Sequence, residues 1–247
     1  MSKKFRNSIV LVLGALSFMV HGAQAMDMKS DPIAVVELFT SQGCSSCPPA
    51  DAFLSELSKR DDVITLAYHV DYWNYIGWKD TFSAKKHSML QRKYAKQTGR
   101  DQIYTPQLVV NGGDDFVGSH QSKINAALEG SSLPISMGLG LQDDTLHVNI
   151  PAQSADIDEA IVWLVSYRQN AEVDIKRGEN RGKKLNYSSI VYDRQIVGMW
   201  RADEATKMMI PVPEMMEEGV DGLAVLVQEK SGKGLPGAIL GAAALSR

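Results

Sequence analysis

The sequence of 247 residues contains only two cysteines, Cys44 and Cys47. Two cysteines are far too few for the dense disulfide framework of small secreted scaffold proteins. The chain also lacks an excess of positive charge, because 26 basic side chains face 29 acidic ones, for a net charge of −3. This balance argues against a nucleic-acid partner. Internal repeats and low-complexity tracts are missing as well.

Long apolar runs are also lacking. One short run, residues 9–20, follows three basic residues and precedes the tripeptide Ala23-Gln24-Ala25. A basic start, a short apolar core and an A-x-A ending are typical of a secretory signal peptide, and the run is too short for a comfortable membrane span. We expect cleavage after residue 25 and an exported chain, periplasmic or secreted, with no stable membrane anchor. An uncleaved N-terminal anchor is the alternative.

The first part of the expected mature chain alternates strand and helix patterns. The apolar run Ile33–Phe39 predicts a buried strand, and Pro48 and Pro49 suit the first turn of a helix, where a missing N–H costs nothing. The further elements predicted are a strand at 63–70, a polar aromatic loop at 71–78, a helix at 83–96, a strand at 107–110, a return strand at 115–118 and a helix at 121–128. This is the order of a thioredoxin fold, which we predict for residues 31–130.

The second part of the chain has a different pattern. A linker at 131–134 precedes a series of short apolar segments without helices between them. The predicted strands lie at 135–141, 146–150, 160–167, 185–192, 195–200, 223–228 and 237–244. Repeated short strands of this kind predict a smaller β-rich, sandwich-like domain over residues 135–247. The fold class is therefore α/β, with a thioredoxin-like domain followed by a β-rich one.

Several polar residues fall at the ends of the predicted strands. Cys44 follows the first strand, and His69 and Asp71 end the second. In a parallel sheet such residues gather beyond the carboxyl ends of the strands. Thr105 and Pro106 enter the third strand, which runs antiparallel in a thioredoxin fold, so its start lies at the same edge. The sequence therefore predicts one site built from segments that are distant in the chain.

The spacing of the two cysteines favours redox chemistry. A thiol at a helix N-terminus meets free N–H groups and the positive end of the helix dipole, which favour the thiolate. We expect Cys44 to be exposed and to attack a substrate disulfide, and Cys47 to be buried and to resolve the mixed disulfide. We expect a cis bond before Pro106, which would place the backbone of Thr105 against the sulfurs, where a peptide could pair as an added strand.

Two loops near this predicted edge have alternative interpretations. The loop at 71–78 could form a substrate platform in which His69, Asp71 and Trp73 bind substrate, or it could pack its own aromatic rings onto the sheet. The charged loop at 177–182 could cover the cysteine site from the second domain, or it could be a solvated turn.

Specific motifs extend through most of the chain, and they resemble those of a known family. The residues that carry the likeness are Phe39-Thr-Ser-Gln-Gly-Cys-Ser-Ser-Cys-Pro-Pro-Ala-Asp51, 69–74, 77–80, 104–112 and 177–183 with Trp200. They resemble a family of exported bacterial proteins of uncharacterised role, domain-of-unknown-function family 1223, classed with the thioredoxin-like superfamily. The likeness to the superfamily implies redox roles for Cys44, Cys47, Thr105 and Pro106. No tryptophan precedes Cys44 and no proline lies between the cysteines, so the direction of catalysis is left open.

These observations predict a thiol–disulfide oxidoreductase that acts on exported proteins or small thiols. The cysteine pair needs no cofactor for this chemistry, and the redox partner is unknown. One alternative is a copper- or zinc-binding module with Cys44, Cys47 and His69 as ligands. Another is a non-catalytic binding protein whose disulfide is structural and never opens.

Overall fold

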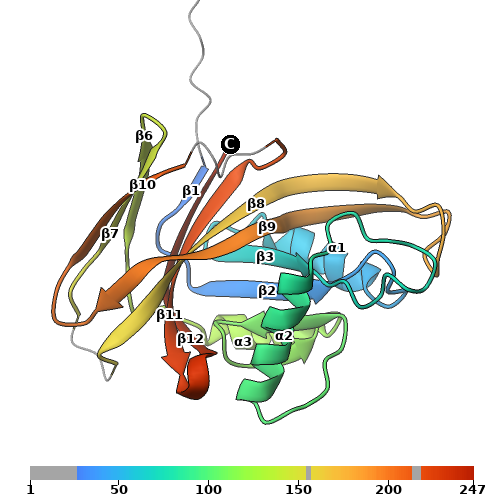
Figure 1. Ribbon diagram of the computed structural model, residues 1–247, viewed down its shortest axis with the longest axis horizontal. Coiled ribbons are helices and arrows are strands. Elements are labelled where there is room, and N and C mark those ends of the chain that lie inside the picture. The colour runs from blue at the N-terminus through green and yellow to red at the C-terminus, as the bar shows by residue number, and fades with distance from the viewer. Residues whose placement is uncertain (1–26, 154–156, 213–217) are drawn as a thin grey trace, which may run out of the picture.

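The computed structural model describes residues 27–153, 157–212 and 218–247, so the predicted signal peptide lies outside the described residues. One nine-stranded sheet runs through the molecule, and three helices lie near its first half (Figure 1). The elements are β1 (Asp27–Lys29), β2 (Ala34–Thr40), α1 (Pro48–Leu57), β3 (Val63–His69), α2 (Lys85–Gln97), β4 (Gln107–Val110), β5 (Asp115–Val117), α3 (Gln121–Glu129), β6 (Gly138–Gln142), β7 (Thr145–Ile150), β8 (Glu159–Asp174), β9 (Lys184–Arg201), β10 (Thr206–Pro211), β11 (Gly222–Ser231) and β12 (Leu235–Ser246).

The order of elements predicted for residues 31–130 is confirmed. β2 and β3 pair in parallel, β4 runs antiparallel to β2, and β5 pairs with β4. Every residue of β2 and β3 is buried, as expected for central strands covered on both faces. α1 begins at its two prolines and buries Phe53, Leu54 and Leu57 against the sheet. These contacts hold the turn that contains the cysteines at the carboxyl end of β2.

The second part of the chain is β-rich, as predicted, but its strands are longer. The segments 185–192 and 195–200, predicted as two strands, form the single strand β9, which pairs with β8 over nearly its whole length. Two register shifts interrupt this pairing, at Tyr192 and at Val197 of β9, but the ladder continues through Asp193 and Arg194 between them. β10, which no sequence pattern indicated, pairs with β7 in a small sheet of order β10-β7-β6.

The two predicted parts share one sheet. Its order is β1-β12-β11-β8-β9-β3-β2-β4-β5, and the junction is the parallel contact of Ala67 on β3 with Ile190 on β9. One hydrophobic cluster joins Phe39 and Tyr68 from the first part with Val165 and Leu226 from the second. Residues 31–130 and 135–247 are therefore packed together through backbone pairing and a common core. A second cluster, around Trp200, packs the small sheet against the large one.

A buried ionic cluster reinforces this junction. The guanidinium of Arg194 on β9 donates to the Glu37 carboxylate (2.7 Å), to the hydroxyl of Tyr68 (3.1 Å) and to the side-chain oxygen of Gln228 (2.6 Å). The hydroxyl of Tyr94 donates to Glu37 at 2.5 Å and accepts from Gln228 at 3.0 Å. We call these five residues the junction cluster. Because they come from β2, β3, α2, β9 and β11, they tie the two parts of the chain together.

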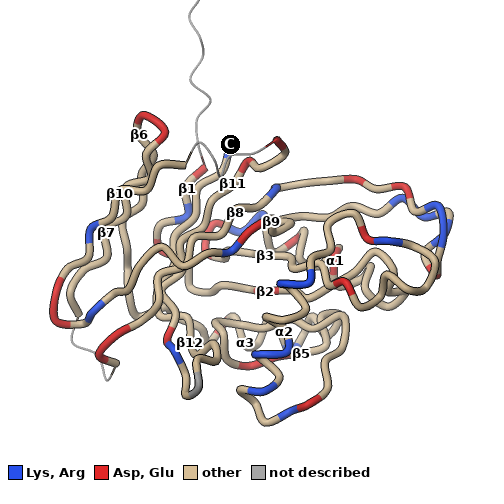
Figure 2. The backbone as a smooth tube through the Cα atoms, in the orientation of Figure 1, with Lys and Arg blue, Asp and Glu red and all other residues tan. Residues whose placement is uncertain are grey.

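Positions of charged residues of both signs are distributed along the backbone (Figure 2). Lysine and arginine are concentrated in the turn between β8 and β9, where residues 176–184 include five basic side chains and one acidic one. No helix in the described ranges is long and apolar enough to cross a membrane.

Candidate functional site

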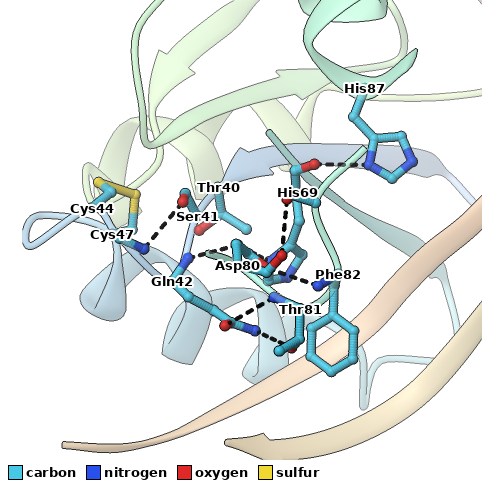
Figure 3. Close-up of polar contacts among 12 residues, drawn as sticks. Thr40, Ser41, Gln42, Cys44, Cys47, His69, Asp80, Thr81, Phe82 and His87 are labelled. Carbon is cyan, nitrogen blue, oxygen red and sulfur yellow. Dashed lines mark hydrogen bonds and ion pairs between the residues drawn. A yellow bond between two sulfur atoms is a disulfide. The ribbon is translucent and has the colours of Figure 1, made fainter. Parts of the chain in front are cut away.

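The two cysteines form a disulfide between the end of β2 and the start of α1 (Figure 3). Cys47 is the N-cap residue of α1, and its carbonyl accepts the backbone N–H groups of Ala50 (2.8 Å) and Asp51 (3.1 Å). The Cα atoms of the two cysteines lie 5.4 Å apart. The sulfurs therefore sit at a helix N-terminus, in the positive field that stabilises a thiolate when the bond opens.

Both cysteines are fully buried, at 0% exposure. The prediction that Cys44 is exposed is therefore wrong. One cover is the loop at 71–78: a Cβ added to Gly43 would lie 3.3 Å from the Cβ of Trp73, so this loop packs closely onto the cysteine turn. The other is the turn between β8 and β9, whose Asn180 amide donates to the carbonyl of Cys44 at 2.9 Å. Neither contact is local in sequence, which is why the burial could not be predicted.

The structure brings Trp73 and Thr105 together at this edge. The indole N–H of Trp73 donates to the Thr105 hydroxyl at 2.7 Å. The peptide bond between Thr105 and Pro106 is cis, which confirms that prediction. A Cβ added to Gly118 would lie 3.2 Å from Pro106 and 2.9 Å from Ala50, so this proline faces the first turn of α1. Trp73 thus spans the space between the cysteine turn and the start of β4.

His69 acts on the cysteine turn through Asp80. Its Nδ1 lies 2.8 Å from the Asp80 carboxylate, which also accepts the backbone N–H groups of Gln42 and Phe82, each at 2.8 Å (Figure 3). Burial alone would lower the pKa of His69, but the negative charges of Asp80 and Asp51 outweigh it and raise the pKa. Burial likewise opposes ionisation of Asp80, but His69 and the N–H donors hold its pKa below the usual value. A buried ion pair therefore fixes the backbone two residues before Cys44.

A second carboxyl lies one helical turn after Cys47. Asp51 is buried, and one of its oxygens accepts the Thr40 hydroxyl at 2.7 Å. Burial, only partly offset by this hydrogen bond and by the charge of His69, raises the pKa of Asp51 to about 7. The group therefore exchanges a proton near neutral pH, whereas an exposed aspartate stays ionised.

Three polar atoms in this region have no hydrogen-bond partner among the described residues. They are the second carboxylate oxygen of Asp51, Nε2 of His69 and the hydroxyl of Tyr187. The rings of His69 and Tyr187 are 4.8 Å apart, and burial and the nearby carboxylates of Asp51 and Asp80 raise the pKa of Tyr187. We call Asp51, His69, Asp80 and Tyr187 the site cluster. Sequence analysis missed three of these four residues, although Asp51 falls four positions after Cys47 and hence on the same helical face.

Two other residues have different surroundings from those expected. Asp71, predicted to bind substrate, accepts the hydroxyl of Ser88 on α2 at 2.5 Å and is partly buried. A histidine on a helix as basic as α2 would be expected to face solvent, but His87 is buried, and its Nδ1–H donates to the His69 carbonyl at 2.9 Å. Burial lowers the pKa of His87 to about 4. The face of α2 that carries His87 packs against the ring of Tyr68. The lysine-rich sequence of α2 gave no sign of this contact.

The ligand set proposed for a metal does not assemble in the structure. Cys44 and Cys47 are bonded to each other, and His69 directs its Nδ1 to Asp80. Within residues 27–153, 157–212 and 218–247, no group of three or more histidine, cysteine, aspartate or glutamate side chains is arranged to hold a metal ion. The geometry therefore gives the metal alternative no support.

Comparisons with known proteins give a family and a structural neighbour. The family model described as "Protein of unknown function (DUF1223)" matches residues 35–228. A crystal structure of a protein from Agrobacterium tumefaciens, solved by a structural genomics consortium, is 36% identical, with a TM-score of 0.78. The alignment covers 87% of this chain and 95% of that one. A search of curated proteins finds no match.

Proposed function

The chain belongs to the DUF1223 family of proteins of unknown function, whose description names no activity, so we propose a function from the site itself. We propose that the protein is an exported thiol–disulfide oxidoreductase that acts through the Cys44–Cys47 pair. We further propose that residues 31–130 have a thioredoxin-like arrangement. The observation that carries the proposal is the disulfide at the N-cap of α1, directly after the central strand β2.

Three further observations support the thioredoxin-like part of this proposal. The strands β3, β2, β4 and β5 are adjacent in that order, with β2 and β3 parallel and β4 antiparallel. The cis bond before Pro106 stands at the start of β4. Trp73 links Thr105 to the cysteine turn, so the residues predicted to act together lie at one edge of the sheet.

The proposed chemistry is a two-electron exchange. A substrate thiolate attacks one sulfur of the disulfide, forms a mixed disulfide and releases the other cysteine as a thiolate. A second substrate thiolate attacks the mixed disulfide, so that two substrate thiols become one substrate disulfide. Their two protons pass to Cys44 and Cys47. Asp51, whose pKa is about 7, is a nearby group that can hold and release a proton during these steps.

The cellular setting is part of the proposal. The N-terminal basic and apolar segments support export, and disulfides persist in oxidising compartments such as the periplasm. Substrates would be exported proteins or small thiols, with no nucleic-acid partner. We propose His69 and Trp73 as residues that shape the substrate site, His69 through Asp80 and Trp73 beside Thr105. Asp71, which binds Ser88, would support the loop from the side of α2.

Redox equilibration and turnover test this function. Mature protein is incubated in buffers of defined thiol–disulfide ratio, and the oxidised fraction is measured by thiol trapping. We expect reversible reduction of a folded protein and catalysed oxidation of a dithiol reporter peptide, with turnover lost in both Cys44→Ser and Cys47→Ser. A disulfide that is reduced only when the protein unfolds, with no turnover at any buffer ratio, would contradict the proposal.

The burial of both cysteines favours a second candidate, a binding protein with a structural disulfide. The disulfide joins cysteines only three positions apart, and a disulfide that closes so short a loop stabilises the folded state only weakly through chain entropy. The two candidates therefore differ in what reduction does to the folded protein. A structural disulfide predicts reduction only on unfolding and no catalysed exchange in the parent protein, whereas the redox proposal predicts exchange with the fold retained.

A further inference from the structure

The turn between β8 and β9 contacts the cysteine turn through polar side chains and packs beside Trp78, since a Cβ added to Gly178 would lie 3.1 Å from the Cβ of Trp78. Asn180, which is fully buried, donates its side-chain amide to the carbonyls of Gln42 (3.0 Å) and Cys44 (2.9 Å). The carboxylate of Glu179 accepts the backbone N–H of Ser45 at 3.3 Å. We call residues 175–183 the cap. Because the contacts that hold it on the cysteine turn are polar, the cap can exchange them for contacts with water or with a polar ligand.

The cap and the adjoining Lys184, which begins β9, together carry an unusual concentration of positive charge on a chain whose net charge is −3. Three of the five lysines and arginines at 176–184 have partners, because Lys176 pairs with Asp174, Lys184 pairs with Glu172, and Lys183 donates to the side-chain oxygen of Asn180. Arg177 and Arg181 are exposed, and neither has an ion pair with any residue that the structure describes. Two arginines thus flank the residues that touch the cysteine turn.

One carboxylate of the cap already contacts the cysteine turn. The Glu179 carboxylate sits on the Ser45 amide, next to Cys44, and its neighbours along the chain include Arg177 and Arg181. An arginine guanidinium can donate two parallel hydrogen bonds to the two oxygens of one carboxylate. A carboxylate from outside could therefore replace Glu179 at the Ser45 amide and bind an arginine at the same time, while Glu179 turns to solvent.

We propose that the cap is the substrate-recognition element of the cysteine site and that it reads a carboxylate-bearing, anionic thiol or disulfide. The substrate carboxylate displaces Glu179 and binds Arg177 and Arg181, which releases Asn180 from Cys44 and uncovers the sulfurs. This inference rests on the proposed function and names its substrate class. The incoming thiolate then breaks the Cys44–Cys47 bond and forms a mixed disulfide, and a second thiol of the same class completes the two-electron reduction.

Reduction of the protein's own disulfide by three small thiols tests the recognition. Mercaptosuccinate is anionic, mercaptoethanol neutral and cysteamine cationic, and each rate is corrected for the thiolate fraction and measured at low ionic strength. We expect the anionic thiol to react about tenfold faster than the cationic one, because the cap attracts it. The double variant Arg177→Gln/Arg181→Gln should abolish this order. Equal corrected rates in the parent protein, or an order that survives in the double variant, would overturn the proposal.

A matched control removes the same charge elsewhere. Arg201 and Lys207 are exposed and lie at the far end of β9 and on β10. Arg201→Gln/Lys207→Gln should keep the charge order, because the general field of the protein changes equally but the cap does not. Loss of the order in this control as well would reduce the effect to net charge and overturn the assignment to the cap.

The covering role of the cap has its own test. Asn180→Ala removes both hydrogen bonds to the cysteine turn and should accelerate reduction by all three thiols about tenfold, without changing their order. Glu179→Gln, a milder change at an exposed position, should also accelerate reduction, since it weakens the bond to the Ser45 amide. Unchanged reduction rates in both variants would overturn the proposal that the cap covers the disulfide.

These reductions are single-turnover measurements on the protein's own disulfide, so they do not depend on catalysis. If the charge order appears but no dithiol reporter is turned over, the proposed function fails and the recognition by the cap stands. If turnover occurs without any charge order, the proposed function stands and the inference about the cap fails.

Discussion

The molecule contains two buried polar clusters that differ in how completely their atoms are paired. In the junction cluster, both oxygens of Glu37, the hydroxyls of Tyr68 and Tyr94, both terminal nitrogens of Arg194 and both polar atoms of the Gln228 amide make hydrogen bonds. Only Nε of Arg194 has no partner among the described residues. Such a cluster can be expected to hold one arrangement, because any movement would leave a buried charge without a partner.

The site cluster is incompletely paired. Asp51, His69 and Tyr187 each have a buried polar atom without a partner in the described parts of the chain. A buried polar group without a hydrogen bond costs the folded state roughly 1–3 kcal/mol. Of these three residues, Asp51 lies one helical turn after Cys47, and the rings of His69 and Tyr187 are 4.8 Å apart. The junction cluster is thus closed by its own hydrogen bonds, whereas the site cluster has atoms that no described residue pairs.

The largest effect is expected where pairing is most complete. Arg194→Met leaves the fully buried Glu37 without its counter-charge, so we expect a loss of up to about 5 kcal/mol in the free energy of unfolding, measured by chemical denaturation. Adding Glu37→Gln should recover part of this loss, because no unpaired charge remains. A loss below about 1 kcal/mol in the single variant would show that the junction does not depend on the pair.

Asp51→Asn should change the pH dependence of stability. The pKa of Asp51 is about 7 in the folded protein and near 4 in an unfolded chain, so the folded state binds the proton more tightly. The stability of the parent protein should therefore fall as pH rises from about 4 to about 7, by at most roughly 4 kcal/mol, and level off above pH 7.

The asparagine variant should lose this slope and become the more stable protein above pH 7. Denaturant unfolding across pH 4 to 8 measures it. The control is Asp143→Asn, an exposed turn position with positive φ that asparagine tolerates, which should leave the slope in place. A slope retained in Asp51→Asn would place its origin elsewhere.

His69→Gln separates the ion pair of the site cluster from its other contacts. The pKa of His69 is raised in the folded state, so its pairing with Asp80 stabilises the fold fully below the unfolded pKa of about 6.5, and this contribution is lost as pH rises through the folded pKa. We expect a loss of about 2 kcal/mol at pH 6 and a smaller loss at high pH. The disulfide should still form, because neither sulfur depends on His69.

Unfolding curves at several pH values and thiol trapping test this variant. His147→Gln, at an exposed position of β7, is the matched control and should be nearly neutral. A protein that binds one equivalent of copper or zinc in its reduced form, and loses that metal in His69→Gln, would restore the metal alternative.

The smallest effect is expected on the outer side of the disulfide. Trp73→Phe removes the hydrogen bond to the Thr105 hydroxyl but keeps the Cβ that packs against Gly43, so we expect a loss of about 1 kcal/mol in unfolding free energy. Tyr75→Phe, in the same loop but 82% exposed, should have no measurable effect. Equal effects of the two substitutions would show that the bond to Thr105 contributes nothing.

Much of the first part of the fold could be predicted because its signals are local. The apolar run before Cys44 and the two prolines after Cys47 each specify an element over a few residues. Strand β9 was divided in two because its middle is polar, around Asp193 and Arg194. Pairing with β8 and burial of Arg194 in the junction cluster outweighed the local pattern there.

The site was predicted less completely than the fold. The spacing of the cysteines and the predicted strand order indicated Cys44, Cys47, Thr105 and Pro106 as candidate residues. Trp73 was a candidate because it lies in a loop that the predicted strand order brings to the same edge. Asp80 and Tyr187 had no recognisable signal. Asp80 reaches the cysteine turn because its loop folds back onto Gln42. Tyr187 reaches His69 because β9 lies beside β3.

The sequence by itself determined the order of strands and helices and the cysteine pair at a helix start, because each depends on the properties of neighbouring residues. The cis bond before Pro106 followed from the predicted strand order, which places Thr105 and Pro106 opposite the cysteines. Only the tertiary structure decided that Cys44 is covered, that Asn180 covers it, and that Arg194 lies opposite Glu37. These contacts join residues more than a hundred positions apart. No local periodicity encodes them, because they form only after the sheet has brought β9 next to β3 and thereby set which side chains are shut off from water.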